Sequence, residues 1–415
     1  MKIILLGYCF IILLGTVLLR LPAAVRDSSE HSVLTAFFTA TSSTCVTGLI
    51  RADTYTNWTL FGQAVILVLI QIGGIGFMTI CISALSLTKK NIGLASRSLM
   101  QSSISAPQLG GIVRMTKFIS LGTLLIEGIG ALLLAFYFCP LLGLGRGIWY
   151  SVFHSISAFC NAGFDLMGIQ GEYSSLTSVV GNWYVNLVIM LLIVIGGIGF
   201  LTWDDVCENK WRFHRYRMQS KVILVTTFAL IVLPALLFFF VDFDALPLGE
   251  RIQAALFQSI TPRTAGFNTV TLSAMSGASQ GVMILLMLVG GSPGSTAGGM
   301  KTTTLAVLVA NAAATFRRRE SAQFFARRVD CGAVKTAATI LMMYLALFFG
   351  GAAFISVYEG LPFSACLYET ASAVGTVGLT LGITPQLRIP SQMVLITLMY
   401  LGRVGGLTLI YAALS

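Results

Sequence analysis

Long apolar runs alternate along this chain with polar connections, and eight of the runs are long enough to cross a lipid bilayer. They cover about residues 3–20, 59–88, 112–139, 181–203, 221–241, 281–312, 333–357 and 391–415. Four further apolar stretches are too short to cross, at about residues 32–44, 148–160, 252–261 and 363–374. Each short stretch lies between two long ones and leads into a glycine-centred segment. The pattern predicts an all-α integral membrane protein built from units of span, short helix and span.

The short stretches are copies of one sequence pattern. They read FTATSSTCVTGL (38–49), FHSISAFCNAGF (153–164), FQSITPRTAGF (257–267) and YETASAVGTVGL (368–379). Their shared glycines, separated by 115, 103 and 112 residues, are Gly48, Gly163, Gly266 and Gly378. Four copies at near-equal spacing predict four repeats. We assign them to residues 1–88, 89–204, 205–316 and 317–415.

Composition agrees with a membrane protein, since the mean hydropathy is +0.86 and only 10% of residues are charged. The net charge of +10 arises from basic residues that gather in the connections between repeats. By the positive-inside rule, these connections and both termini are predicted to be cytoplasmic in a bacterial plasma membrane. Topology therefore explains the basic excess, and no nucleic-acid partner is predicted.

The chain shows no pattern for a covalent cofactor or a resident metal. The eight cysteines contain no CxxC pair, and the three histidines lie far apart. The segment Met1–Val25 is predicted to be a retained first span, because its apolar run exceeds the usual length in a signal peptide. A signal peptide cleaved near LPAAV is the alternative.

The glycine segments have the residue types that an ion filter needs. Non-helical backbone at membrane depth is stable only where protein encloses it or where it lines a water-filled path, so the four segments should face one axis. Glycine permits positive φ, which can turn successive carbonyls toward one point and replace the hydration shell of a monovalent cation. Ordinary packing loops are the alternative, although they do not require four matching copies. The predicted filter segments comprise Val46, Thr47, Gly48, Asn161, Ala162, Gly163, Thr264, Ala265, Gly266, Thr376, Val377 and Gly378.

The motifs CVTGL, FCNAGFD, RTAGFN and TVGLT resemble the four pore loops of the Trk/Ktr/HKT superfamily of potassium and sodium transporters. The resemblance covers essentially the whole chain, and the eight-span length is most similar to the Ktr membrane subunits (KtrB). It implies K⁺ as the transported ion, held at the filter segments of one monomer, with Na⁺ as an activator. It also implies a homodimer on a cytoplasmic ring of RCK subunits, similar to KtrA, that bind ATP or ADP. In this family, glycine in all four loops is associated with selectivity for potassium, whereas serine in the first loop is associated with selectivity for sodium.

The second span of repeat three is interrupted by GGSPGSTAGGMKTTT at residues 290–304. Glycine is a poor helix former and proline removes a backbone hydrogen bond, so this segment predicts a broken helix below the filter. The resemblance implies an intramembrane loop that obstructs the pore. Met300 interrupts a near match to a phosphate-binding loop, so ATP hydrolysis is not predicted. The candidate gate residues are Gly290, Gly291, Ser292, Gly294, Ser295, Thr296, Gly298, Gly299, Lys301 and Arg403.

Ionisable side chains within the apolar runs are further candidates. Arg403 lies inside the last span, where a charge usually faces protein or water, although packing against backbone carbonyls is an alternative. Glu127 and His154 are predicted to be structural. Asp165 follows the second filter segment and, with Asp53 and Glu369, is a candidate for concentrating cations at the outer mouth.

These features together predict potassium uptake by channel-like permeation, in a protein that is not an enzyme. An alternating-access transporter coupled to sodium or protons is the alternative, and it would need interrupted spans at corresponding positions. We expect a pronounced break only in repeat three.

Overall fold

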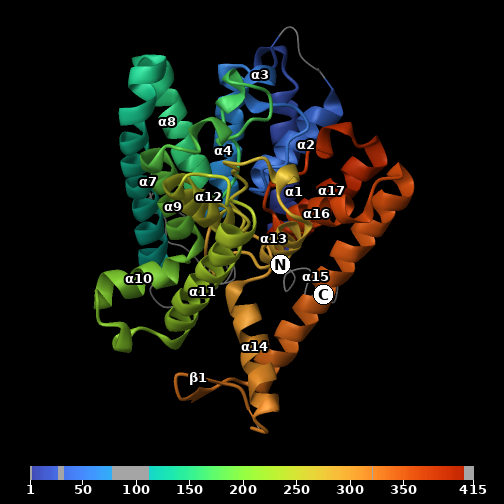
Figure 1. Ribbon diagram of the computed structural model, residues 1–415. Helices are drawn as coiled ribbons and strands as arrows, with labels where there is room; N and C mark the ends of the chain where they lie inside the picture. The colour runs from blue at the N-terminus through green and yellow to red at the C-terminus, as the bar shows by residue number, and fades with distance from the viewer. Residues whose placement is uncertain (1, 27–31, 77–111, 320, 406–415) are drawn as a thin grey trace.

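A computed structural model describes residues 2–26, 32–76, 112–319 and 321–405 of the chain, and it is mostly helical (Figure 1). Predictions about residues 77–111 and 406–415 lie outside the described residues. They include the boundary between the first two repeats and the end of the last span.

Three kinds of helix recur in each repeat. The first helices are α1 (Lys2–Leu19), α7 (Ile112–Leu142), α11 (Met218–Val241) and α15 (Cys331–Glu359). The short helices are α2 (Val33–Thr44), α8 (Leu144–Phe159), α12 (Leu248–Ile260) and α16 (Phe363–Gly375). The second helices are α4 (Leu60–Ile75), α9 (Trp183–Gly197), α13 (Gly277–Leu288) and α17 (Ile389–Val404).

Smaller elements connect these helices. The helical ones are α3 (Thr54–Asn57), α10 (Phe200–Asn209) and α14 (Thr302–Phe316). An antiparallel hairpin of β1 (Gln323–Phe324) and β2 (Arg327–Arg328) joins α14 to α15 and lies beside the lower part of α14 in Figure 1. The 3-10 turns are Pro22–Ala24, Met167–Ile169, Thr177–Val179, Phe213–Arg215, Leu272–Ala274 and Thr384–Gln386.

The repeats contact one another in a closed order. Helix α4 packs on α8, α9 on α12, α13 on α16, and α17 on α2. Figure 1 accordingly shows the blue α2 beside the red α16 and α17, although they stand at opposite ends of the chain. Each short helix also packs on the first helix of its own repeat. Each short helix thus packs between the first helix of its own repeat and the second helix of the preceding one.

The short helices cannot cross a bilayer. The longest, α8, has 16 residues, which corresponds to about 24 Å against a hydrocarbon core of about 30 Å. Each of them ends just before a filter segment. Helix α2 begins at Ser32, whose hydroxyl accepts a hydrogen bond from the Leu34 amide.

A sharp bend also breaks the second helix of repeat two. Helices α9 and α10 meet at 99° beside Gly199 (φ 92°), whereas α4 and α17 have Gly76 (φ 90°) and Gly405 (φ 85°) as their C-terminal caps. A left-handed residue cannot continue a right-handed helix, so the break follows from these glycines. The prediction that only repeat three has a pronounced break is therefore wrong.

Few of the described helices are long enough to be assigned as membrane spans. Among the described residues, three helices are long and apolar enough to cross a membrane: α11, α15 and residues Arg114–Leu142 of α7. The bent pair α9 and α10 would make a fourth, and five further apolar helices are shorter. The count of eight spans stays a prediction.

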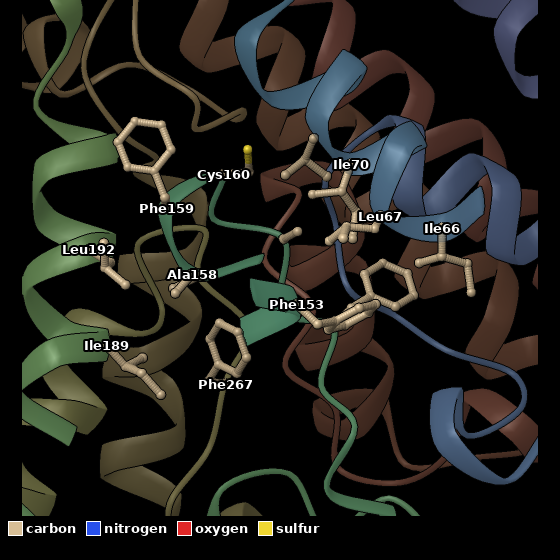
Figure 2. Close-up of a cluster of buried hydrophobic side chains, with 14 of the residues drawn as sticks. Ile66, Leu67, Ile70, Phe153, Ala158, Phe159, Cys160, Ile189, Leu192 and Phe267 are labelled. Carbon is tan, nitrogen blue, oxygen red and sulfur yellow. The ribbon is translucent and has the colours of Figure 1, made fainter. Parts of the chain in front are cut away.

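A buried apolar cluster fixes the second short helix. Figure 2 shows Ile66 and Ile70 of α4, Phe153 and Phe159 of α8, and Ile189 of α9 packed together. In a membrane such packing stabilises mainly through van der Waals contact, because lipid tails are as apolar as the side chains. The cluster therefore positions α8 and the filter segment that follows it.

Candidate functional site: four converging loops and the loop beneath them

The four filter segments meet at one place. A Cβ atom on Gly48 would lie 2.5 Å from the Ala162 carbonyl oxygen, and one on Gly163 would lie 2.8 Å from the Gly266 Cα. A Cβ atom on Gly266 would press on the Val377 carbonyl oxygen, and one on Gly378 would lie 2.9 Å from the Gly48 Cα. Each repeat thus touches the next, and the fourth returns to the first. Only glycine fits at the four positions.

The backbone of each filter segment is unusual in the same way. The residue two positions before each glycine has positive φ: 56° at Val46, 58° at Asn161, 67° at Thr264 and 52° at Thr376. The glycines themselves have φ of 67° to 94°. Three of the four non-glycine residues are β-branched, for which this conformation is an outlier that costs on the order of 1–3 kcal/mol. Left-handed backbone at alternate residues can bring successive carbonyls to one side, as a carbonyl filter requires.

One hydroxyl at or near the end of each short helix holds the filter segment that follows. It stands four residues after the aromatic residue that begins each copy. Ser42 Oγ accepts from the Gly48 amide at 3.1 Å, and Ser372 Oγ accepts from the Gly378 amide at 3.0 Å. In the other two repeats the hydroxyl donates to the carbonyl after the glycine, in the pairs Ser157–Phe164 and Thr261–Phe267. Sequence reasoning missed these hydroxyls, although their shared spacing was visible in the copies.

The interruption between α13 and α14 forms a compact loop, residues 289–301, which we call the inner loop. Val289 pairs with Met300, and the Gly290 amide donates to the Met300 carbonyl at 2.8 Å. A Cβ atom on Gly299 would lie 2.9 Å from the Gly375 carbonyl oxygen, just before the fourth filter segment. The inner loop therefore lies directly against the filter, where the sequence placed a gate.

Backbone hydrogen bonds attach the inner loop to the bend between α9 and α10. The Ser292 amide donates to the Gly197 carbonyl at 2.9 Å, and the Phe200 amide donates to the Gly294 carbonyl at 2.7 Å. A Cβ atom on Gly199 would lie 2.7 Å from the Pro293 carbonyl oxygen. Repeat two thus supports the loop of repeat three through its broken helix.

Arg403 joins three elements that are distant in sequence. Its Nη1 donates to the Thr296 carbonyl in the inner loop at 2.6 Å, and its Nη2 donates to the carbonyls of Gly73 and Gly74 at the end of α4. A helix C-terminus carries partial negative charge, so α4 is a favourable partner for the guanidinium. Arg403 holds the inner loop against the first repeat.

The other gate candidates lie in or beside the inner loop. Lys301 Nζ donates to the Ala297 and Gly298 carbonyls at 2.7 and 3.3 Å, so this side chain folds back onto its own loop. Ser292 and Thr296 are fully buried, and Thr296 Oγ1 donates to the Phe159 carbonyl at 3.0 Å. The remaining predicted gate residues, Gly290, Gly291, Gly294, Ser295, Gly298 and Gly299, all belong to the same loop.

The three carboxylates predicted to lie at the outer mouth differ in burial. Asp53 is buried and caps α3 by accepting from the Tyr55 amide at 2.9 Å, and Glu369 is fully buried within α16. Neither faces an outer mouth, so that prediction is wrong for both. Asp165 is only partly buried and accepts from the Met167 amide at 2.9 Å.

The structure gives Glu127 a local partner. Its Oε2 accepts from Gln71 Nε2 at 2.9 Å, which joins α7 to α4. This agrees with the predicted structural role.

Comparison with known proteins places this geometry in a family. A family model described as TrkH, cation transport protein, matches residues 9–414. The potassium/sodium uptake protein NtpJ of Enterococcus hirae is 37% identical across 98% of this chain and 91% of its own. Ktr system potassium uptake protein B of Bacillus subtilis is 37% identical across 99% of this chain and 92% of its own.

A solved structure has the same fold. The potassium transporter TrkH from Vibrio parahaemolyticus matches with a TM-score of 0.77 at 18% identity, over 98% of this chain and 84% of that chain. A family match over nearly the whole sequence, with close relatives among the Ktr proteins, shows that this multi-pass membrane protein belongs to the TrkH family of cation transport proteins.

Proposed function

We propose that this chain carries potassium into a bacterial cell by channel-like permeation through the four filter segments. The architecture proposed with it is eight spans and four re-entrant short helices around one central pore, with both termini in the cytoplasm. The observation that carries the proposal is the closed approach of Gly48, Gly163, Gly266 and Gly378, one from each repeat. The names of the relatives from E. hirae and B. subtilis, both uptake proteins for potassium, support the choice of ion.

The chemistry of the converging loops suits a dehydrated cation. Four short helices end there, and each directs the partial negative charge of its C-terminus toward the filter segments. The Thr47 and Thr376 hydroxyls are buried and lack a hydrogen-bond partner among the described residues. Backbone carbonyls and such hydroxyls are hard oxygen ligands, which suit K⁺ as the transported substrate. An inside-negative membrane potential would drive its entry.

The inner loop is the proposed gate. It blocks the side of the filter opposite the outer mouth and is held by Arg403 and by the bend beside Gly199. A hydrogen bond from a charged donor contributes about 1.5–3 kcal/mol, so releasing Arg403 would shift the loop toward an open position. Opening then requires displacement of one loop and no rearrangement of the short helices.

The proposed assembly is a homodimer seated on a cytoplasmic RCK ring that binds ATP or ADP, with Na⁺ as an activator. Similarity to the Ktr system proteins supports it. Proteoliposomes with the purified chain test the proposal: an inside-negative potential should drive Rb⁺ uptake, and an RCK partner should change the rate. Absence of uptake both with and without the partner would overturn it.

An alternating-access transporter coupled to Na⁺ or H⁺ is a second candidate, favoured by the breaks in the second helices of repeats two and three. The reversal potential separates the two. Channel-like flux reverses at the equilibrium potential of K⁺, whereas coupled flux shifts when the Na⁺ or H⁺ gradient is changed at constant K⁺.

A further inference from the structure

One buried position recurs in all four short helices, directly after the aromatic residue that begins each copy. Its occupants are Thr39, His154, Gln258 and Glu369. All four are at most 1% exposed, yet three of them are strongly polar. Buried polar groups need hydrogen-bond partners, so the partners of these side chains indicate their purpose.

Glu369 bonds to the chain that leaves the fourth filter segment. One carboxylate oxygen accepts from the Leu381 amide at 3.1 Å and from the Thr380 hydroxyl. The other accepts from Thr384 Oγ1 at 2.6 Å. Three donors therefore hold this segment to α16 through one side chain.

Gln258 makes the corresponding contact in repeat three. Its Nε2 donates to Thr269 Oγ1 at 3.4 Å. Thr269 stands three residues after Gly266, as Leu381 stands three residues after Gly378. The same distance along the chain is thus bridged by a different side chain.

His154 bridges the same distance in repeat two. Its Nε2 accepts from the amide of Leu166, three residues after Gly163, at 3.3 Å. A backbone amide can only donate, so Nε2 carries no proton and Nδ1 donates to the Tyr150 carbonyl at 2.8 Å. Nε2 therefore forms the bridge to Leu166, and Nδ1 bonds to the preceding turn of α8.

Repeat one has no such bridge. The Thr39 hydroxyl is buried and makes no hydrogen bond with any residue that the structure describes. The four-fold pattern is therefore braced in three repeats and unbraced in one.

We propose that Glu369, Gln258 and His154 are positioning residues that brace the outer side of the filter and set its preference for K⁺ over Na⁺. The inference rests on the proposed function. Each filter segment holds a non-glycine residue in a strained left-handed conformation, which persists only where surrounding contacts fix it. A filter that cannot contract around the smaller Na⁺ discriminates better than one that can, so the braces affect selectivity more than the ability to transport.

The test measures K⁺ and Na⁺ uptake in proteoliposomes for variants at the equivalent position of three repeats. Glu369→Leu removes three bonds and should lower the K⁺ to Na⁺ uptake ratio about tenfold, whereas Gln258→Met removes one and should lower it about two- to threefold. Glu369→Gln keeps an acceptor and should restore most of the ratio. Thr39→Val, at the unbraced position, should leave it unchanged.

A second readout separates bracing from general stability. Stabilisation of the purified protein by K⁺ relative to Na⁺, measured as the difference in melting temperature, should shrink in Glu369→Leu and persist in Thr39→Val. If Glu369→Leu does not fold, Thr384→Val removes one donor and should lower the ratio about two- to fivefold.

The outcomes distinguish this inference from the proposed function. If the Glu369 and Gln258 variants fold and keep the wild-type K⁺ to Na⁺ uptake ratio, the bracing inference alone is overturned. The same holds if Thr39→Val lowers this ratio as much as they do. A wild-type chain that neither takes up Rb⁺ nor is stabilised by K⁺ would overturn both.

Discussion

Gly378→Ser perturbs the filter at the point where the fourth repeat meets the first. The added Cβ atom would lie 2.9 Å from the Gly48 Cα and closer still to the Thr47 carbonyl oxygen. Carbon atoms make good contact at about 3.5–4.0 Å, so the fourth segment must move by roughly 0.6 Å or more. The carbonyls that precede Gly378 would move with it.

Two costs add at this position. The φ of 94° is unfavourable for serine by about 1–2 kcal/mol, and relief of the contact displaces a proposed ion ligand. A loss of about 1.4 kcal/mol in discrimination corresponds to a tenfold change in an equilibrium constant. We therefore expect the K⁺ to Na⁺ uptake ratio to fall by about tenfold, with a lower rate of Rb⁺ uptake.

The assay is ion uptake by proteoliposomes with matched amounts of folded protein. Gly382→Ser is the control, because Gly382 has nearly the same φ, 93°, but no atom near its would-be Cβ. It introduces the same backbone strain without the contact. If Gly378→Ser keeps the wild-type rate and ratio, or if Gly382→Ser loses as much, the assignment of Gly378 to a tightly closed filter is refuted.

Three further predictions concern the inner loop and the loop between α8 and α9. Arg403→Gln should raise Rb⁺ flux several-fold, because the shorter amide cannot reach both the inner loop and α4; an unchanged flux argues against a gate. Gly199→Ala should lower the melting temperature and also raise flux, since its Cβ atom would displace Pro293; a stable variant with normal flux contradicts this anchor. Desolvation of its carboxyl group raises the pKa of Asp165, in the loop between α8 and α9, to about 7. A carboxyl with a folded-state pKa above its unfolded value of about 4 destabilises the fold as pH rises between the two, so Asp165→Asn should flatten the decline in melting temperature from about pH 4 to 7. A slope equal to that of the wild type would show that another group is responsible.

The sequence was sufficient to locate four segments whose glycines meet in the structure, because repetition supplied four independent copies of one short pattern. A glycine is required wherever the backbones of two segments lie in direct contact, so it recurs at the same place in every copy. A packing or turn glycine would not need to recur in this way. The same reasoning failed for Glu369, since a carboxylate beside a filter segment gives no sign of whether it turns outward or back into its own helix.

The partners of Arg403 were also beyond prediction. They are backbone carbonyls, which every residue possesses, and Gly73 lies 330 positions earlier in the chain. The bend beside Gly199 was predictable in principle, because the motif GGIG occurs in two second helices, at residues 73–76 and 196–199. It was interpreted as packing only, and the structure shows that these glycines also end helices.

The contact between α17 and α2 has a consequence for biogenesis. A chain is inserted into the membrane from its N-terminus while synthesis continues. The last quarter supplies one side of the proposed ion path and the arginine that bonds to the inner loop. If the proposed function holds, a partly synthesised chain lacks a closed ion path, and completion of that path coincides with delivery of the residue that holds the proposed gate. The order of synthesis would itself protect the cell from leaks through unfinished copies.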